Sequence, residues 1–139
     1  MASLHLKIIT PQKIVIEQDI ESVTVSTFTG EITVLEHHTN LFSLLVEGVV
    51  KIKKNGQEDF LAIGGGYLET DGHEVNILVS KAYGQDKIDH ELITKSIENA
   101  KKILAQSKDR SERIEAASAL RRSLIDMKLM KRKRRTVVA

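Results

Sequence analysis

Residues 75–104 read VNILVSKAYGQDKIDHELITKSIENAKKIL, and the periodicity of the chain changes inside this stretch. Val75 to Val79 is a short β-rich run. After Asp89, which can cap a helix, apolar residues recur at intervals of three and four: Leu92, Ile93, Ile97, Ala100 and Leu104. We therefore expect two domains, a β-domain over residues 1–86 and a helical domain over residues 87–139.

Upstream of this stretch, the sequence has short alternating runs separated by turns. Leu4, Leu6 and Ile8 alternate with polar residues, which indicates a half-buried strand. Asn55-Gly56 is a strong hairpin signal between two further runs. About nine such runs at regular spacing predict an all-β sandwich or barrel.

Downstream, a second helix is predicted after Asp109-Arg110-Ser111-Glu112, which has the form of a capping box. Its expected apolar face consists of Ile114, Ala117, Leu120, Leu124 and Met127. Spacings of 7, 11 and 14 return to nearly the same angle of a helix, so a separate basic stripe is expected at Arg121, Lys128, Arg132 and Arg135. The short loop predicts an antiparallel hairpin, which must lean on the β-domain or on another protein.

Charge is segregated along the chain. Residues 1–88 hold 7 Lys/Arg against 12 Asp/Glu, residues 89–107 are balanced, and residues 108–139 hold 11 against 4, within an overall net charge of +2. A basic arm of this kind indicates an acidic partner. From composition alone it could also be a solvated helix end or a site for nucleic acid or lipid.

Motifs for catalysis or metal binding are weak. Gly64-Gly65-Gly66 lacks the Lys-Ser/Thr of a phosphate loop and fits a glycine-rich strand or bulge better. His37-His38 has no metal-ligand spacing with His5, His73 or His90, and the chain has no cysteine. We expect no enzyme site, no metal site and no resident cofactor. No run is long enough to cross a bilayer and no secretory leader is evident, so a cytoplasmic or peripheral location is expected.

Two segments carry a family resemblance. The first is Gly30-Glu31-Ile32-Thr33-Val34-Leu35-Glu36-His37-His38-Thr39-Asn40-Leu41, followed by the turn and strand of Glu47 to Ile52. The second runs from Ala62-Ile63-Gly64-Gly65-Gly66-Tyr67-Leu68-Glu69 to the strand Val75 to Ala82. Together with the opening Leu6 to Pro11, they resemble the epsilon subunit of the bacterial and chloroplast F-type ATP synthase. Thr33, Glu36 and Thr39-Asn40 depart from the usual pattern.

The resemblance implies a ten-stranded β-sandwich followed by a helix–turn–helix, in a non-catalytic subunit of the central stalk that couples proton flow to rotation. The implied partners are the gamma subunit and the c ring, with a contact at Glu31, His38, Thr39, Asn40 and Leu41. The hairpin would inhibit ATP hydrolysis by facing an acidic loop of the beta subunit with Arg121, Arg122, Lys128, Lys131, Arg132, Lys133, Arg134 and Arg135. The implied location is peripheral, on the cytoplasmic face of the plasma membrane or the stromal face of the thylakoid.

Some members of that family bind ATP through an Ile/Leu-Asp-x-x-Arg-Ala motif. This chain keeps Ile88 and Asp89 but has Leu92 and Ile93 in place of the Arg and Ala. Weak or absent ATP binding is therefore expected, although Arg121 and Arg122 could still supply positive charge. The second hypothesis is a nucleic-acid-binding adaptor that uses the basic hairpin; few aromatic residues and an acidic β-domain count against it. An enzyme comes third.

Overall fold

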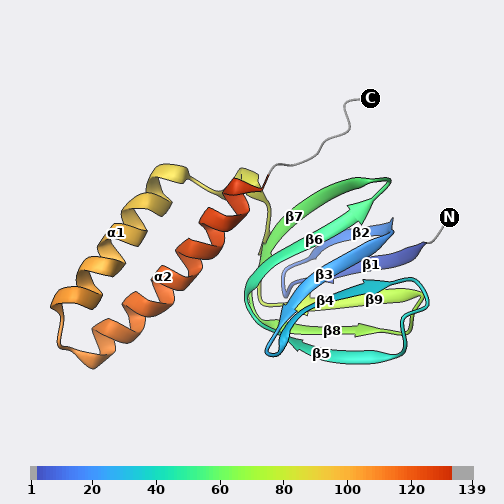
Figure 1. Ribbon diagram of the computed structural model, residues 1–139, viewed down its shortest axis with the longest axis horizontal. Coiled ribbons are helices and arrows are strands. Elements are labelled where there is room, and N and C mark those ends of the chain that lie inside the picture. The colour runs from blue at the N-terminus through green and yellow to red at the C-terminus, as the bar shows by residue number, and fades with distance from the viewer. Residues whose placement is uncertain (1–2, 133–139) are drawn as a thin grey trace.

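The computed structural model describes residues 3–132, which form a β-domain with two helices beside it (Figure 1). Ten strands build the β-domain, as the resemblance implies. They are β1 (Leu4–Ile9), β2 (Ile14–Ile20), β3 (Ser22–Thr27), β4 (Gly30–Leu35), β5 (Leu41–Leu45), β6 (Gly48–Lys54), β7 (Gln57–Ile63), β8 (Gly66–Thr70), β9 (Glu74–Val79) and β10 (Ala82–Tyr83).

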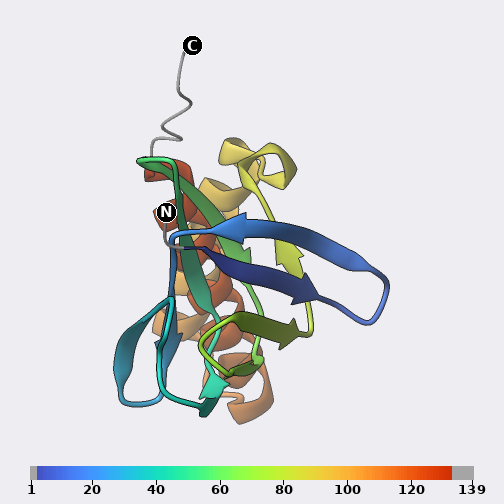
Figure 2. The ribbon, with the colours of Figure 1, turned by 90° about the vertical axis from the view of Figure 1, so that its right-hand side faces the viewer.

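The strands follow the order β10-β7-β6-β3-β5-β8-β9-β1-β2, and β4 pairs with β3. All pairs are antiparallel except β1 with β9, which run parallel. The sheet folds over on itself, so that β1 and β2 lie on the opposite side of the β-domain from the helices (Figure 2). The fold is the predicted sandwich, nearly closed into a barrel.

Alternation along the strands sets the core, because successive side chains of a strand point to opposite faces. Leu4, Leu6 and Ile8 are fully buried, as their alternation predicts. In β6, Val50 and Ile52 are buried in the same way, so Val49 and Lys51 point outward. The buried apolar cluster draws only on residues 4–79, all from the β-domain.

The Asn55-Gly56 hairpin is confirmed. Both residues have positive φ, 52° and 75°, as a two-residue turn between twisted strands requires, and they join β6 to β7. The glycines that follow β7 do not form a phosphate loop. They lead from β7 into β8, which starts at Gly66 and pairs with β9.

A 3-10 turn, η1 (Gln85–Lys87), leads to α1 (His90–Gln106), and α2 (Arg110–Lys131) returns antiparallel to it. Asp89 caps α1 as predicted, since its side chain accepts hydrogen bonds from the backbone N–H groups of Glu91 and Leu92. The predicted capping box of α2 is only half formed. Asp109 accepts from the N–H of Ser111, but the Glu112 carboxylate accepts instead from Ser107 Oγ, at 2.8 Å.

The predicted apolar faces of the hairpin are partly wrong. Ile93 and Ala100 of α1 are buried, but Leu92 is 64% exposed. In α2, Ile114 and Leu124 are exposed, whereas Ala116, Ser123 and Leu129 are buried. The reason is that α2 packs between α1 and the β-domain, and its first turns project beyond the sheet (Figure 1). A helix with two neighbours does not show a single apolar stripe.

Candidate interaction surfaces

The basic stripe of α2 faces the β-domain. Arg121 Nε lies 2.7 Å from Glu47 Oε1, and the Arg132 guanidinium lies 5.4 Å from the centre of the Phe60 ring. Lys128 and Arg132 also line a recess with Glu31 and Glu58. The stripe is thus separate from the α1-facing side, as its spacing predicts. Of the cations proposed for regulation, Arg122 and Lys131 are exposed, and Lys133, Arg134 and Arg135 lie outside the described residues.

Two residues of the connection to α1 hold the C-terminal half of α2. The Tyr83 hydroxyl donates to the Asp126 carboxylate. Burial and this hydrogen bond raise the pKa of Tyr83. Gln85 Nε2 donates to the backbone carbonyls of Leu129, at 2.7 Å, and of Arg132. Gln85 therefore satisfies carbonyls that the last turn of a helix leaves without helical partners.

Sequence reasoning missed these two contacts, because each joins residues more than forty positions apart. A partial signal was available. Tyr83 and Gln85 are polar side chains at the end of the last strand, where a returning helix can meet them.

The signature segment Gly30 to Leu41 is a strand followed by a loop. Glu31 lies at the start of β4, next to the α2 recess, whereas His38 lies beyond its end. The five residues of strand from Glu31 to Leu35 span about 13 Å. Thr39 and Asn40 are exposed in the loop, and Leu41 begins β5. The expected contact residues thus form two groups at opposite ends of β4.

The loop around His38 is fixed by the turn between β8 and β9. The N–H of His37 donates to the carbonyl of Gly72, at 2.8 Å, and the His37 and His73 rings meet edge to face. His38 Nδ1 lies 2.7 Å from the carbonyl oxygen of Thr39. Backbone contacts therefore place His38, Thr39 and Asn40 in a defined arrangement at one end of the sandwich.

Two of the residues considered for ATP binding, Asp89 and Arg121, have other partners here. Asp89 uses its carboxylate to cap α1, and Ile88 precedes it in extended backbone. Arg121 is paired with Glu47, and Arg122 is exposed. Within residues 3–132, no group of three or more His, Cys, Asp or Glu side chains is placed to hold a metal ion.

An exposed apolar band crosses the other outer face of the sandwich. Strand register places five apolar side chains in one row: Leu44, Tyr67, Leu78, Ile9 and Ile14. Phe42 adds to the row by stacking on Tyr67, with ring centres 5.1 Å apart. Phe42, Leu44 and Ile14 are each more than half exposed. Contiguous apolar surface of this kind marks an interaction site on a soluble protein.

Sequence analysis did not find this apolar band, because its members come from five strands whose register the sequence does not give. One signal was present. In β5, Phe42 and Leu44 sit at alternate positions, and so do Leu41 and Leu45, so both faces of that strand carry apolar residues.

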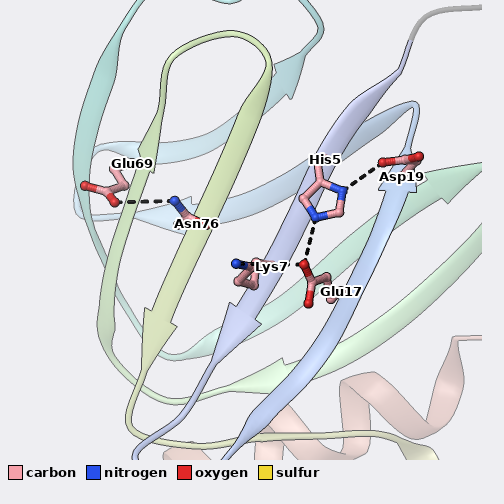
Figure 3. Close-up of polar contacts among 6 residues, drawn as sticks. All are labelled: His5, Lys7, Glu17, Asp19, Glu69 and Asn76. Carbon is pink, nitrogen blue, oxygen red and sulfur yellow. Dashed lines mark hydrogen bonds and ion pairs between the residues drawn. The ribbon is translucent and has the colours of Figure 1, made fainter.

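Beside the apolar band lies a charged cluster on β1 and β2 (Figure 3). His5 stands between two carboxylates, with Nδ1 2.8 Å from Asp19 Oδ1 and Nε2 3.0 Å from Glu17 Oε2. Hydrogen bonds to Asp19 and then Glu17 raise the pKa of His5 above its ordinary value of 6.5. Lys7 Nζ is 3.8 Å from the same Glu17 oxygen. On the neighbouring strands, Asn76 Nδ2 donates to Glu69 Oε1 at 3.4 Å.

Comparison with known proteins bears on these surfaces. Residues 3–85 match the family model described as the beta-sandwich domain of the ATP synthase delta/epsilon chain. The chain belongs to the ATP synthase epsilon chain family. Curated relatives extend the match into the helices, since the ATP synthase epsilon chain of Nitratidesulfovibrio vulgaris is 33% identical over 91% of this chain and 95% of its own.

Other members come from diverse sources. The epsilon chain of Caldanaerobacter subterraneus is 35% identical over 91% of this chain and 93% of its own. The chloroplastic epsilon chain of Pinus thunbergii is 31% identical over 87% of this chain and 88% of its own. The resemblance to bacterial and chloroplast forms is therefore confirmed.

A solved structure agrees. A chain in the cryo-EM structure of Euglena gracilis mitochondrial ATP synthase, titled OSCP/F1/c-ring in rotational state 1, superposes with a TM-score of 0.78 at 27% identity, over 86% of this chain and 76% of that one. None of the helices in residues 3–132 is both long and apolar enough to cross a membrane.

Proposed function

We propose that this epsilon-family chain is a non-catalytic subunit of the central stalk of an F-type ATP synthase, where it couples proton flow to rotation and restrains ATP hydrolysis. Support for this place in the assembly comes from its similarity to a chain of an F1/c-ring structure. The proposed location is peripheral, on the cytoplasmic face of the plasma membrane or the stromal face of the thylakoid.

The proposed restraint of ATP hydrolysis is based on how α2 docks on the β-domain. Its basic side chains lie beside acidic side chains that another acidic partner can replace. Arg121 meets Glu47, and Lys128 and Arg132 share a recess with acidic side chains of the β-domain. Partly exposed ion pairs are worth about 0–1 kcal/mol each, so an acidic loop of the beta subunit can replace them. Several such pairs together shift a two-state hairpin by a few kcal/mol.

The test is ATP hydrolysis by a reconstituted catalytic head with the full chain added. Changing Arg121, Arg122, Lys128, Lys131 and Arg132 to Ala should relieve the inhibition, and the relief should be larger at low salt. Changing the exposed Lys95, Lys101 and Lys102 of α1 to Ala is the matched control and should leave inhibition intact. Equal hydrolysis with the wild-type chain and the α2 variant would show that this helix is not the brake.

For the static contact, we propose that the apolar band packs against the gamma subunit, and that Glu31, His38, Thr39, Asn40 and Leu41 contact gamma or the c ring. Replacing Phe42 and Leu44 with Ser should weaken assembly with gamma, since both side chains are largely exposed in the isolated chain. Replacing the exposed Leu92 and Leu124 with Ser is the control. In a separate variant, Glu31→Lys with His38→Ala should weaken coupling, and normal assembly and coupling would contradict this assignment.

ATP is proposed to bind weakly or not at all. Leu92 stands where the family motif has its arginine, and it is exposed at the start of α1. Calorimetry with the isolated chain should give no saturable heat at millimolar ATP. Tight saturable binding would overturn the proposal.

A further inference from the structure

Strand β4 is an open edge of the β-domain. Within residues 3–132 it pairs with β3 alone, in an unbroken antiparallel register that runs from Ser22 opposite Leu35 to Thr27 opposite Gly30. Neighbouring residues of a strand direct their backbone N–H and C=O groups to opposite sides, so alternate residues of β4 present these groups to the open side. An edge of this kind is a template for an added strand.

The side chains of β4 do little to protect this edge. Ile32 and Val34 point to the core, so Glu31, Thr33 and Leu35 point outward. All three outward side chains are exposed, and Leu35 is 56% exposed. Edge strands are usually blunted by lysine, proline or a bulge, and β4 has none of these.

Strand β2, another edge of the sheet, is better protected. It pairs only with β1, and that pairing is interrupted by a register shift between Ile8 and Ile9. Its exposed side chains include Glu17 and Asp19, so two copies of β2 that paired antiparallel would bring carboxylates opposite or close to one another. Strand β4 carries a single charged residue, Glu31, and is therefore better suited to pair with a copy of itself.

We propose that two copies of the free chain associate weakly through their β4 edges, antiparallel about a twofold axis beside Thr33. In this register, Glu31 lies opposite Leu35 of the second copy, and Ile32 lies opposite its Val34. Thr33 lies opposite Thr33 of the second copy. All five residues from Glu31 to Leu35 are thus paired, and the two carboxylates are kept apart.

Neighbouring registers are poorer. An axis beside Glu31 would place two carboxylates directly opposite each other, which is destabilising. An axis beside Ile32 would bring Leu35 to the turn between β3 and β4 and leave it uncovered. The axis beside Thr33 instead covers the exposed Leu35 with the aliphatic part of the Glu31 side chain from the second copy. This register therefore combines the most pairing with the least repulsion.

The association is expected to be weak. Five paired residues extend over about 17 Å, and two strands of this length bury less than the about 1,200 Å² typical of stable interfaces. We therefore expect half-association at about 0.1–1 mM chain. Because the pairing covers Glu31, a paired copy could not make the contact with gamma or the c ring proposed above. The proposal concerns the free chain and does not depend on that function.

Sedimentation of the full chain tests the proposal. The weight-average mass should rise from that of one chain, 15.6 kDa, at about 10 μM toward twice that value at about 1 mM. Thr33→Lys places two like charges beside the twofold axis and should abolish the rise. Thr94→Lys is the matched control, because Thr94 is also exposed but lies on α1. A mass that stays at one chain at about 1 mM would overturn the proposal.

Cross-linking tests the register without relying on Thr33→Lys. The chain has no cysteine, so Glu31→Cys and Leu35→Cys each supply one thiol. When equal amounts of the two variants are treated with oxidised glutathione, the mixed disulfide dimer should clearly exceed the half share expected of random pairing. A random mixture would overturn the proposal. Association that persists in Thr33→Lys but is lost in Phe42→Ser would equally overturn it and would identify the apolar band as the surface that self-associates.

Discussion

At the residue scale, Gly66 shows how closely two strands approach. A Cβ at this position would lie 2.0 Å from the carbonyl oxygen of Leu78 and 2.8 Å from Val79 Cα, both backbone atoms that cannot move aside cheaply. At Gly65, by contrast, the nearest atom to such a Cβ is the Leu45 oxygen at 3.6 Å. Gly66 therefore has no room for a side chain, whereas Gly65 has room for a methyl group.

We therefore expect Gly66→Ala to lower the free energy of unfolding by about 1–3 kcal/mol, the usual range for overpacking a close contact. Gly65→Ala should have little effect and is the matched control. Urea unfolding of both variants, followed by circular dichroism, measures the difference. Equal midpoints would mean that the contact between β8 and β9 relaxes without strain.

His5 gives the sandwich a pH dependence whose sign follows from its partners. Its pKa is raised in the folded state by Asp19 and Glu17, so its stabilising contribution is complete below the ordinary value of 6.5 and is lost as pH rises through the folded pKa. The pKa of Glu17 is lowered, chiefly by His5, so its contribution is lost as pH falls below the ordinary 4.5. The cluster therefore contributes most to the stability of the fold between about pH 4.5 and pH 6.5.

Denaturant unfolding between pH 5 and 9 is the measurement. The wild-type chain should lose stability relative to His5→Gln as pH rises above about 6.5. His90→Gln, on the exposed first turn of α1, is the control and should follow the wild-type curve. A stability difference that grows with pH would contradict the cluster geometry.

At the element scale, the docking of α2 depends on a few side chains. Tyr83→Phe removes the hydroxyl that donates to Asp126 while it keeps the ring. A hydrogen bond to a charged group is worth about 1.5–3 kcal/mol, so the docked hairpin should be weakened by about that amount or less. Hydrogen exchange of α2 amides should speed up, whereas core strands keep their rates. Tyr67→Phe, in the apolar band, is the matched control.

The sequence predicts the strands and turns better than it predicts how they pack and which surfaces they form. Strand alternation at Leu4, Leu6 and Ile8 and the Asn55-Gly56 turn are local signals, and both predictions are confirmed. The exposure of Leu92 and Leu124 depends on where α2 meets a second neighbour, which no local pattern encodes. The apolar band depends on the register of five strands, and so it too becomes visible only in three dimensions.

At the scale of the whole molecule, the main buried apolar cluster lies in the β-domain, since it is built from residues 4–79. We predict that residues 1–86 fold alone, although this boundary falls inside η1. The excised domain should unfold cooperatively, with coincident transitions by fluorescence and circular dichroism. A gradual, probe-dependent transition would mean that the hairpin is required for folding.

The parallel pairing of β1 with β9 has a consequence for synthesis of the chain. The first strand acquires its second neighbour only when Glu74 to Val79 has left the ribosome, so until then β1 and β2 remain an isolated two-stranded hairpin, which is marginal in water. Bringing β1 and β9 together closes a loop of more than sixty residues, which costs conformational entropy before their pairing can stabilise the fold. The N-terminal hairpin therefore waits for most of the β-domain, and a pause in translation before β9 would prolong the exposure of its apolar face to chaperones and to other nascent chains.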